Sequence, residues 1–191
     1  MKKILLLTIS TLTLASFSVL AQSKKQTKKS VPKKKSVEII TSKKNDEITT
    51  LVWTTDVMKA DSISKKTNKP IFGFFTGSDW CGWCHKLQND VFAKKDFIKW
   101  AKEKVVLLEL DFPRKKQLPQ ELQQQNYGLA QAFQVQGYPT VWLFTINRDS
   151  ATGANVKLNA LGSLGYPSGA VLGKEEIKFL ETANSILNKG K

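Results

Sequence analysis

Residues 70–84 read Pro-Ile-Phe-Gly-Phe-Phe-Thr-Gly-Ser-Asp-Trp-Cys-Gly-Trp-Cys, and this stretch decides the fold. It opens with a nearly continuous apolar run from Pro70 to Thr76, which is typical of a strand buried on both faces of a sheet. Residues 77–79, Gly-Ser-Asp, then predict a turn. The turn leads into a helix that carries Cys84, Leu87 and Val91 on one face. The sequence therefore places the cysteine pair where a buried strand turns into a helix.

This arrangement puts Cys81 at the N-terminus of the helix, where unpaired backbone N–H groups and the helix dipole favour an anion. In Cys-x-x-Cys motifs the thiol pKa falls from about 8.5 to between about 3.5 and 7.5. Cys84 follows within one helical turn, so its sulfur can reach Cys81. We therefore expect Cys81 to attack a substrate disulfide and Cys84 to resolve the mixed disulfide that results.

Three other interpretations of the cysteine pair are open. A purely structural disulfide would close a very small loop and would constrain the unfolded chain little. Residues 81–85 also match the Cys-x-x-Cys-His signature of c-type haem attachment, with Met58 as the one methionine outside the first 21 residues. A zinc ion would find three ligands here and no evident fourth. We expect neither a metal nor a bound cofactor.

The remaining sequence predicts further strands and helices. Four further helices are expected. The first lies between Asp56 and Asn68, and the second runs to about Lys102 with Phe97, Ile98 and Ala101 inward. The third has Leu122, Leu129, Ala130 and Phe133 on one face, and the last, at the end of the chain, has Ile177, Leu180, Ala183 and Leu187 on one face. Strands are expected over 105–111, 140–145 and 156–161, with a turn over 147–153. Parallel strands come first and a hairpin last, which predicts an α/β sandwich with a mixed central sheet.

The strand, the Trp-Cys-Gly-x-Cys motif, the helix, and later Gly-Tyr-Pro-Thr at 137–140 together resemble the thioredoxin superfamily over residues 50–188. They are most similar to its exported bacterial members with Phe-Thr-Gly-Ser-Asp-Trp-Cys-Gly-Trp-Cys. The resemblance implies a thioredoxin-like three-layer sandwich, with a mixed central β-sheet flanked by helices, and a thiol–disulfide oxidoreductase. It also implies a cis peptide bond before Pro139, facing the cysteines, with Tyr138 lending backbone polar groups to the substrate.

The sequence departs from the family pattern in three places. Trp83 stands where the family usually has proline, which leaves open whether the pair acts as a reductant or as an oxidant. The strand before the motif contains no acid, whereas many thioredoxins bury an aspartate there to move the proton of the resolving cysteine. Asp79 is a candidate substitute, and the alternative is that it caps the helix. Extra length around residues 113–126 predicts a surface loop or a longer helix.

Other side chains of the motif are also candidates for function. His85 could stabilise the thiolate or transfer a proton near neutral pH, and the alternative is an exposed helix residue with no task. Trp80 and Trp83 are expected to form an apolar rim that binds substrates. Three further tryptophans, Trp53, Trp100 and Trp142, lie in patterns typical of the core.

The formal charge of +14 is concentrated near the N-terminus, where residues 22–44 contain nine lysines and one acid, Glu38. The rest of the chain is only mildly basic, which argues against a specific nucleic-acid binder. Residues 1–21 combine Lys2 and Lys3 with an uncharged apolar stretch and predict a cleavable signal peptide, with an N-terminal membrane anchor as the alternative. The predicted organisation is a signal peptide over 1–21, a lysine-rich disordered linker over 22–47 and a thioredoxin-like domain over 48–191.

These features predict a periplasmic or secreted protein. Its expected partners are cysteine-containing protein substrates and a membrane or periplasmic redox partner that resets the cysteine pair. The linker is expected to be a solvated tether, and weak contact with anionic surfaces is the alternative. The alternative function is a thioredoxin-like binding module tethered to an anionic surface, with its cysteines redox-idle.

Overall fold

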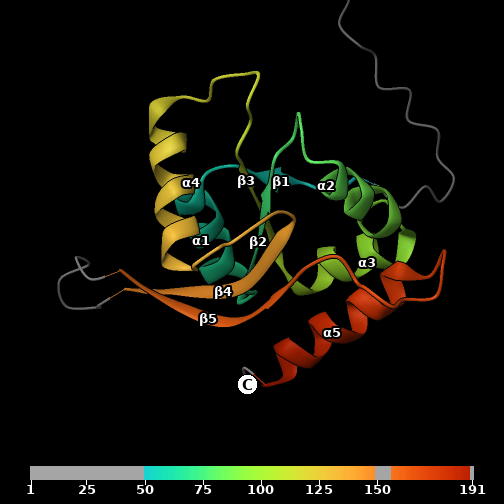
Figure 1. The fold of residues 1–191 in the computed structure, drawn as a ribbon. Coiled ribbons are helices and arrows are strands. Elements are labelled where there is room, and N and C mark those ends of the chain that lie inside the picture. The colour runs from blue at the N-terminus through green and yellow to red at the C-terminus, as the bar shows by residue number, and fades with distance from the viewer. Residues whose placement is uncertain (1–49, 149–155, 190–191) are drawn as a thin grey trace, which may run out of the picture. The chain divides into compact units, whose positions relative to one another are not determined.

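The computed structural model describes residues 50–148 and 156–189. Its centre is a five-stranded sheet in the order β1–β3–β2–β4–β5 (Figure 1). The strands are β1 Trp53–Thr54, β2 Ile71–Thr76, β3 Val106–Asp111, β4 Thr140–Arg148 and β5 Val156–Leu164. β3 is parallel to β1 and β2, whereas β4 is antiparallel to β2 and β5. The mixed sheet, with parallel strands first and a hairpin last, confirms the prediction.

Helices cover both faces of this sheet. α1 Val57–Thr67 and α4 Gln120–Ala132 lie on one face, and α2 Gly82–Leu87, α3 Lys95–Lys104 and α5 Glu175–Lys189 lie on the other (Figure 1). A π-helical segment, Gln88–Phe92, connects α2 to α3. Within the described residues, no helix has both the length and the apolar character needed to cross a bilayer. The three layers are those that the sequence predicts.

Short-range interactions set the ends of α1, and the apolar run that follows forms β2, the strand that leads to the cysteines. Asp56 caps α1, because its Oδ1 accepts the N–H groups of Met58 and Lys59 at 2.8 and 3.3 Å. Asn68 adopts a left-handed conformation, with φ of 54°, and ends the helix. Every residue of β2 is buried, as its apolar run predicts.

The core has two parts because successive side chains of β2 point to opposite faces. Phe72 and Phe74 pack with Cys81 and Cys84 on the side of α2, α3 and α5. On the other side, Ile71 and Phe75 pack with Ala60 of α1, with Leu129 of α4 and with Phe133, which caps the C-terminus of α4. The cysteine pair therefore belongs to one of the two core layers.

Some local predictions need correction. The sequence does not predict β1, because two residues are too few to show a period, nor the π-helical segment. In α5, Ile177 does not lie on the buried face as predicted, because it is 45% exposed, and Phe179 is buried instead. Ile98 is half-buried, and Trp100 takes the inward position. The predicted turn over 147–153 begins with two residues of β4, and residues 149–155 lie outside the described part.

Candidate active site

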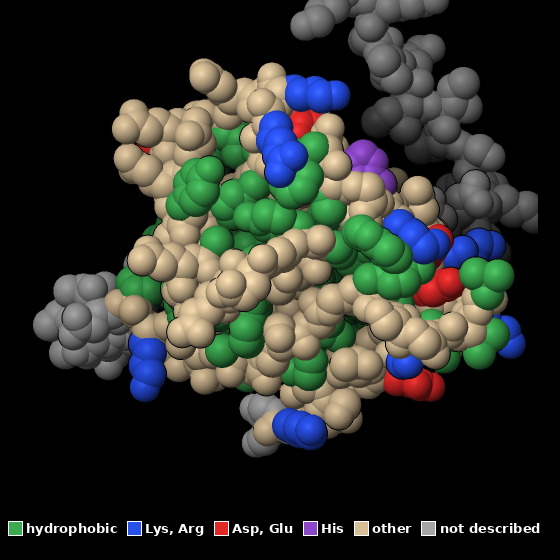
Figure 2. Space-filling model, viewed as in Figure 1, with side chains coloured by type: hydrophobic (Ala, Val, Ile, Leu, Met, Phe, Trp, Pro, Cys, Tyr) green, Lys and Arg blue, Asp and Glu red, His purple; other side chains and the backbone are tan. Residues whose placement is uncertain are grey.

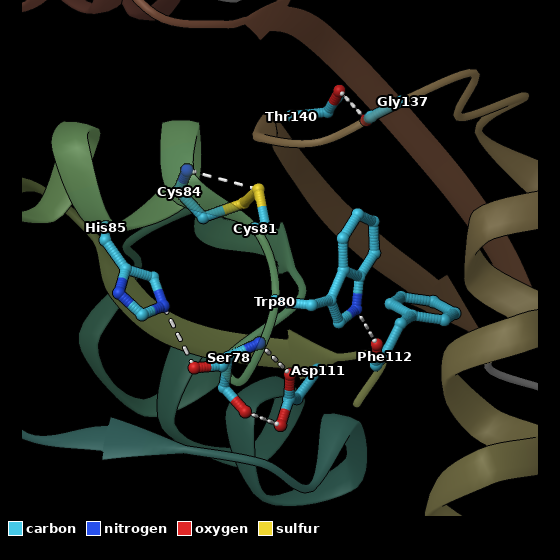
Figure 3. Close-up of a disulfide and its surroundings, with 9 residues drawn as sticks. All are labelled: Ser78, Trp80, Cys81, Cys84, His85, Asp111, Phe112, Gly137 and Thr140. Atoms are coloured by element: carbon cyan, nitrogen blue, oxygen red, sulfur yellow. Dashed lines mark hydrogen bonds between the residues drawn. A yellow bond between two sulfur atoms is a disulfide. The ribbon is translucent and has the colours of Figure 1, made fainter. Parts of the chain in front are cut away.

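The two cysteines lie at the turn from β2 into α2. The carbonyl of Gly77 accepts the N–H groups of Trp80 and Cys81 at 3.2 and 2.9 Å. Cys81 is the N-cap residue of α2, and its Sγ accepts the N–H of Cys84 at 3.1 Å. The two residues form a disulfide, with 5.2 Å between their Cα atoms (Figure 3). Cys84 is fully buried and Cys81 is 5% exposed, so Cys81 is the more accessible of the two.

Trp80 is folded back over the turn that precedes the cysteines. Its indole N–H donates to the carbonyl of Phe112 at 2.8 Å, as Figure 3 shows. The Arg114 guanidinium lies 3.7 Å from the centre of the Trp80 ring, and the Tyr138 ring packs edge-on at 5.8 Å. A Cβ on Gly77 would lie 2.4 Å from the indole, so any larger residue there would displace the Trp80 ring. Trp80 therefore connects the motif to the end of β3 and to the loop before β4.

Asp79 holds the segment that follows β3. Its two carboxylate oxygens accept the N–H groups of Arg114 and Lys115 at 3.0 and 2.7 Å. The hydrogen bond from the Arg114 amide is the main reason that the pKa of Asp79 lies below its usual value, with further backbone donors adding to it. The helix cap is Cys81, so Asp79 does not have the capping role that the sequence allows as the alternative.

Ser78 joins the motif to a buried carboxylate. Its N–H and its Oγ donate to the two oxygens of Asp111 at 2.8 and 2.6 Å. Lys116 pairs with the same carboxylate at 3.0 Å. On the other side, Nε2 of His85 lies 3.0 Å from the Ser78 carbonyl (Figure 3). His85 thus packs its ring against the turn that carries the cysteines.

β3 carries two acids near its end, whereas β2 carries none. The strand register pairs Phe74 with Glu109 and Thr76 with Asp111, so both acids lie on the face of the sheet that packs against the cysteines. Burial raises the pKa of Glu109, and the charge of Asp111 raises it further. From the sequence alone, these acids have no assigned role. Their position in an otherwise apolar, buried strand is the feature of the sequence that could have drawn attention to them.

Trp83 is held on the opposite side of the motif from Trp80. It is 59% exposed, and its ring packs edge-on against Tyr166 at 5.2 Å. The Tyr166 hydroxyl donates to Asp90 at 2.7 Å, and Lys86 pairs with the same carboxylate at 2.6 Å. Sequence reasoning missed Tyr166, because it lies 83 positions after Trp83 on the segment between β5 and α5.

The loop before β4 has the conformation that the resemblance implies. The bond between Tyr138 and Pro139 is cis. Thr140 Oγ1 donates to the carbonyl of Gly137 at 2.7 Å and closes the loop, which Figure 3 shows across from the disulfide. Because Tyr138 also contacts Trp80, the structure brings together two of the residues that the sequence proposes for substrate binding. In the described part of the chain, no three His, Cys, Asp or Glu side chains converge as a metal site.

A disulfide at the N-terminus of a helix, opposite a cis-proline loop on a mixed sheet, agrees with the family comparison. The model of the thioredoxin-like domain matches residues 57–155. The chain belongs to this thioredoxin-like family. The match covers β2, both cysteines, β3, α4 and the cis-proline loop, and thus all of the site except Tyr166.

Two curated relatives of this thioredoxin-like protein come from Chlamydia pneumoniae. The disulfide bond reductase DsbH is 42% identical over 76 residues, which are 40% of this chain and 46% of the relative. The thioredoxin-related protein DsbJ is 27% identical over 145 residues, which are 76% of this chain and 39% of the relative. The chain thus spans less than half the length of either relative.

Two solved structures have a similar fold. The DsbH oxidoreductase superposes with a TM-score of 0.59 at 29% identity, covering 72% of this chain and 85% of that structure. A thioredoxin from Thermus thermophilus gives a TM-score of 0.50 at 14% identity, over 73% and 89% of the two chains, and supports the fold alone.

Proposed function

We propose that this protein is a thiol–disulfide oxidoreductase that exchanges disulfides with cysteine-containing proteins. The observation that carries the proposal is a disulfide between the N-cap cysteine of α2, which is 5% exposed, and a fully buried cysteine one turn later. This asymmetry gives the two sulfurs different tasks, because a substrate reaches the Cys81 sulfur more readily than the buried Cys84 sulfur. The name of the relative DsbH, a disulfide bond reductase, supports action in the reducing direction.

Cys81 is the proposed nucleophile. As a thiolate it attacks one sulfur of a substrate disulfide, the substrate S–S bond breaks, and the leaving sulfur takes up a proton. The N–H of Cys84 already donates to the Cys81 sulfur, and this hydrogen bond favours the thiolate over the thiol. Cys84 then loses its proton and attacks Sγ of Cys81, which releases the second substrate thiol. Two electrons pass to the substrate, and the Cys81–Cys84 disulfide is left to be reset by a redox partner.

Four side chains are proposed to bind the substrate. Trp80 and Trp83 flank the cysteines, and Tyr138 with Pro139 forms the loop across from them. Of the two candidates for proton transfer, we favour His85 over Asp79, because both oxygens of Asp79 accept hydrogen bonds from backbone amides.

Export is part of the proposal. It is supported by the basic and then apolar pattern of residues 1–21, and the lysine-rich residues 22–47 are proposed as a tether. A periplasmic or secreted location would require a reductant outside the cytoplasm to reset the pair. The mass of the protein recovered from the producing cells tests the cleavage after residue 21.

The decisive experiment is insulin reduction with a dithiol as the electron source. The wild-type protein should accelerate it, Cys81→Ser should abolish the acceleration, and Cys84→Ser should accumulate a mixed disulfide that mass spectrometry detects. A redox titration then gives the direction, on a scale from about −270 mV for thioredoxin to about −120 mV for a strong oxidant. If the wild-type protein accelerates nothing and forms no mixed disulfide, the redox-idle binding module is the better description.

A further inference from the structure

The segment after β3 brings two cationic residues, Arg114 and Lys115, to the turn that precedes Cys81. Residues 113–118 follow Phe112, whose carbonyl accepts the Trp80 indole N–H. Asp79, two positions before Cys81, accepts the amides of both Arg114 and Lys115. The backbone of this segment is therefore hydrogen-bonded directly to the motif. The Arg114 side chain lies against Trp80, the residue that precedes Cys81.

Arg114 and Lys115 have no carboxylate partner within the part of the chain that the structure describes. The neighbouring cations differ, because Lys116 pairs with Asp111 and Lys86 pairs with Asp90. Asp79 directs its carboxylate to backbone amides. Both Arg114 and Lys115 are exposed. Figure 2 shows Lys and Arg side chains at the border of a hydrophobic patch, close to the histidine, which is the only one in the chain.

The contact with Trp80 holds the charged side chain of Arg114 in one position. The guanidinium lies 3.7 Å from the ring centre, a cation–π contact that restricts the side chain. The planar guanidinium of an arginine held in this way can still donate its N–H groups to a carboxylate. Because the side chain is already ordered, it loses less conformational entropy when it binds the carboxylate. The aromatic surface and the cationic donors are thus adjacent.

We propose that Arg114 and Lys115 form a cationic rim that favours substrates with carboxylates next to the reactive cysteine. The inference rests on the proposed function, since it names the class of substrate for the same cysteine pair. An acidic segment beside the substrate sulfur would lie against this rim while Cys81 attacks. Exposed charges at the edge of a binding site act mainly on encounter and selectivity, so the effect should depend on salt.

Matched peptides test the proposal. Three peptides of one sequence carry a single disulfide-linked cysteine flanked by Asp, Gln or Lys, and each rate is divided by the rate with the dithiol alone. The full-length wild-type protein should reduce the Asp peptide about fivefold faster than the Lys peptide at low salt, which is about 1 kcal/mol at the transition state. The preference should fade in 1 M NaCl, where the Debye length is about 3 Å.

Two double variants carry the same change of charge. Arg114→Gln with Lys115→Gln should abolish the preference, while the Gln peptide reports any general loss of activity. Lys66→Gln with Lys157→Gln removes two exposed lysines, one in the last turn of α1 and one at the start of β5, both away from the motif, and should keep the preference. Equal rates for all three peptides with the wild-type protein would refute the proposal that the cationic rim favours substrates with carboxylates. Absence of reduction of any peptide instead overturns the proposed oxidoreductase function.

Discussion

Both carboxylate oxygens of Asp111, at the end of β3, accept hydrogen bonds from Ser78, one from its N–H at 2.8 Å and one from its Oγ at 2.6 Å. The two residues are 33 positions apart in sequence. Asp111 is 5% exposed, and its backbone carbonyl accepts a further bond from Asn126 of α4. Because Ser78 lies three positions before Cys81, this contact fixes the turn that presents the cysteine pair.

Replacement of Asp111 by Asn should destabilise the protein by about 2 kcal/mol, because the amide cannot accept both donors and the loss of a buried hydrogen bond to a charged group costs about 1.5–3 kcal/mol. Ser78→Ala removes only the hydroxyl bond and should cost about 1 kcal/mol. Urea denaturation measures both. The double variant should lose clearly less than the sum, and strictly additive losses would show that the two side chains do not act together.

Gly77→Ala should displace the Trp80 ring, since the added Cβ would lie 2.4 Å from the indole. We expect a loss of about 1–3 kcal/mol, typical of an overpacked site, together with slower insulin reduction. Gly128→Ala is the matched control, because its Cβ would meet nothing within 4 Å. This change in the interior of α4 should stabilise the protein by about 0.5–1 kcal/mol. Equal behaviour of the two variants would refute the close contact.

Glu109 gives a prediction about pH. Its folded-state pKa is raised by burial and then by the charge of Asp111, so the folded protein holds the proton to higher pH than the unfolded chain. The stability that Glu109 contributes is therefore fully present below its unfolded pKa of about 4.3 and is lost as the pH rises through the folded pKa. Glu109→Gln should lack this loss. The stability difference between wild type and variant should move in favour of the variant from pH 4 to pH 7 in urea titrations, and a constant difference would contradict the prediction.

Tyr166 should matter through its ring more than through its hydroxyl. Tyr166→Phe keeps the edge-on contact with Trp83 and loses only the part-buried hydrogen bond to Asp90, so activity should stay within twofold of wild type. Tyr166→Leu removes an aromatic pair worth about 0.5–1.5 kcal/mol. We expect a KM for insulin that is about threefold higher, with unchanged reduction of a small disulfide. A larger effect of the Phe variant would assign the role to the hydroxyl.

The sequence by itself determined the elements around the cysteines, because their signals are local. The apolar run of β2, the glycine turn and a cysteine spacing of one helical turn lie within fifteen consecutive residues. Asp56 and Asn68 likewise mark the ends of α1 through contacts of a few positions. The cis bond before Pro139 follows from the family resemblance and agrees with the structure.

Only the tertiary structure decided how the site is held. The contacts of Ser78 with Asp111, of Arg114 with Trp80 and of Tyr166 with Trp83 join residues more than thirty positions apart. They depend on β3 lying beside β2 and on the chain returning after β5, and hydrophobic periodicity carries no information about strand neighbours. A buried acid on β3 therefore looks like an interruption of an apolar strand in the sequence, whereas the fold places it beneath the turn that carries Cys81.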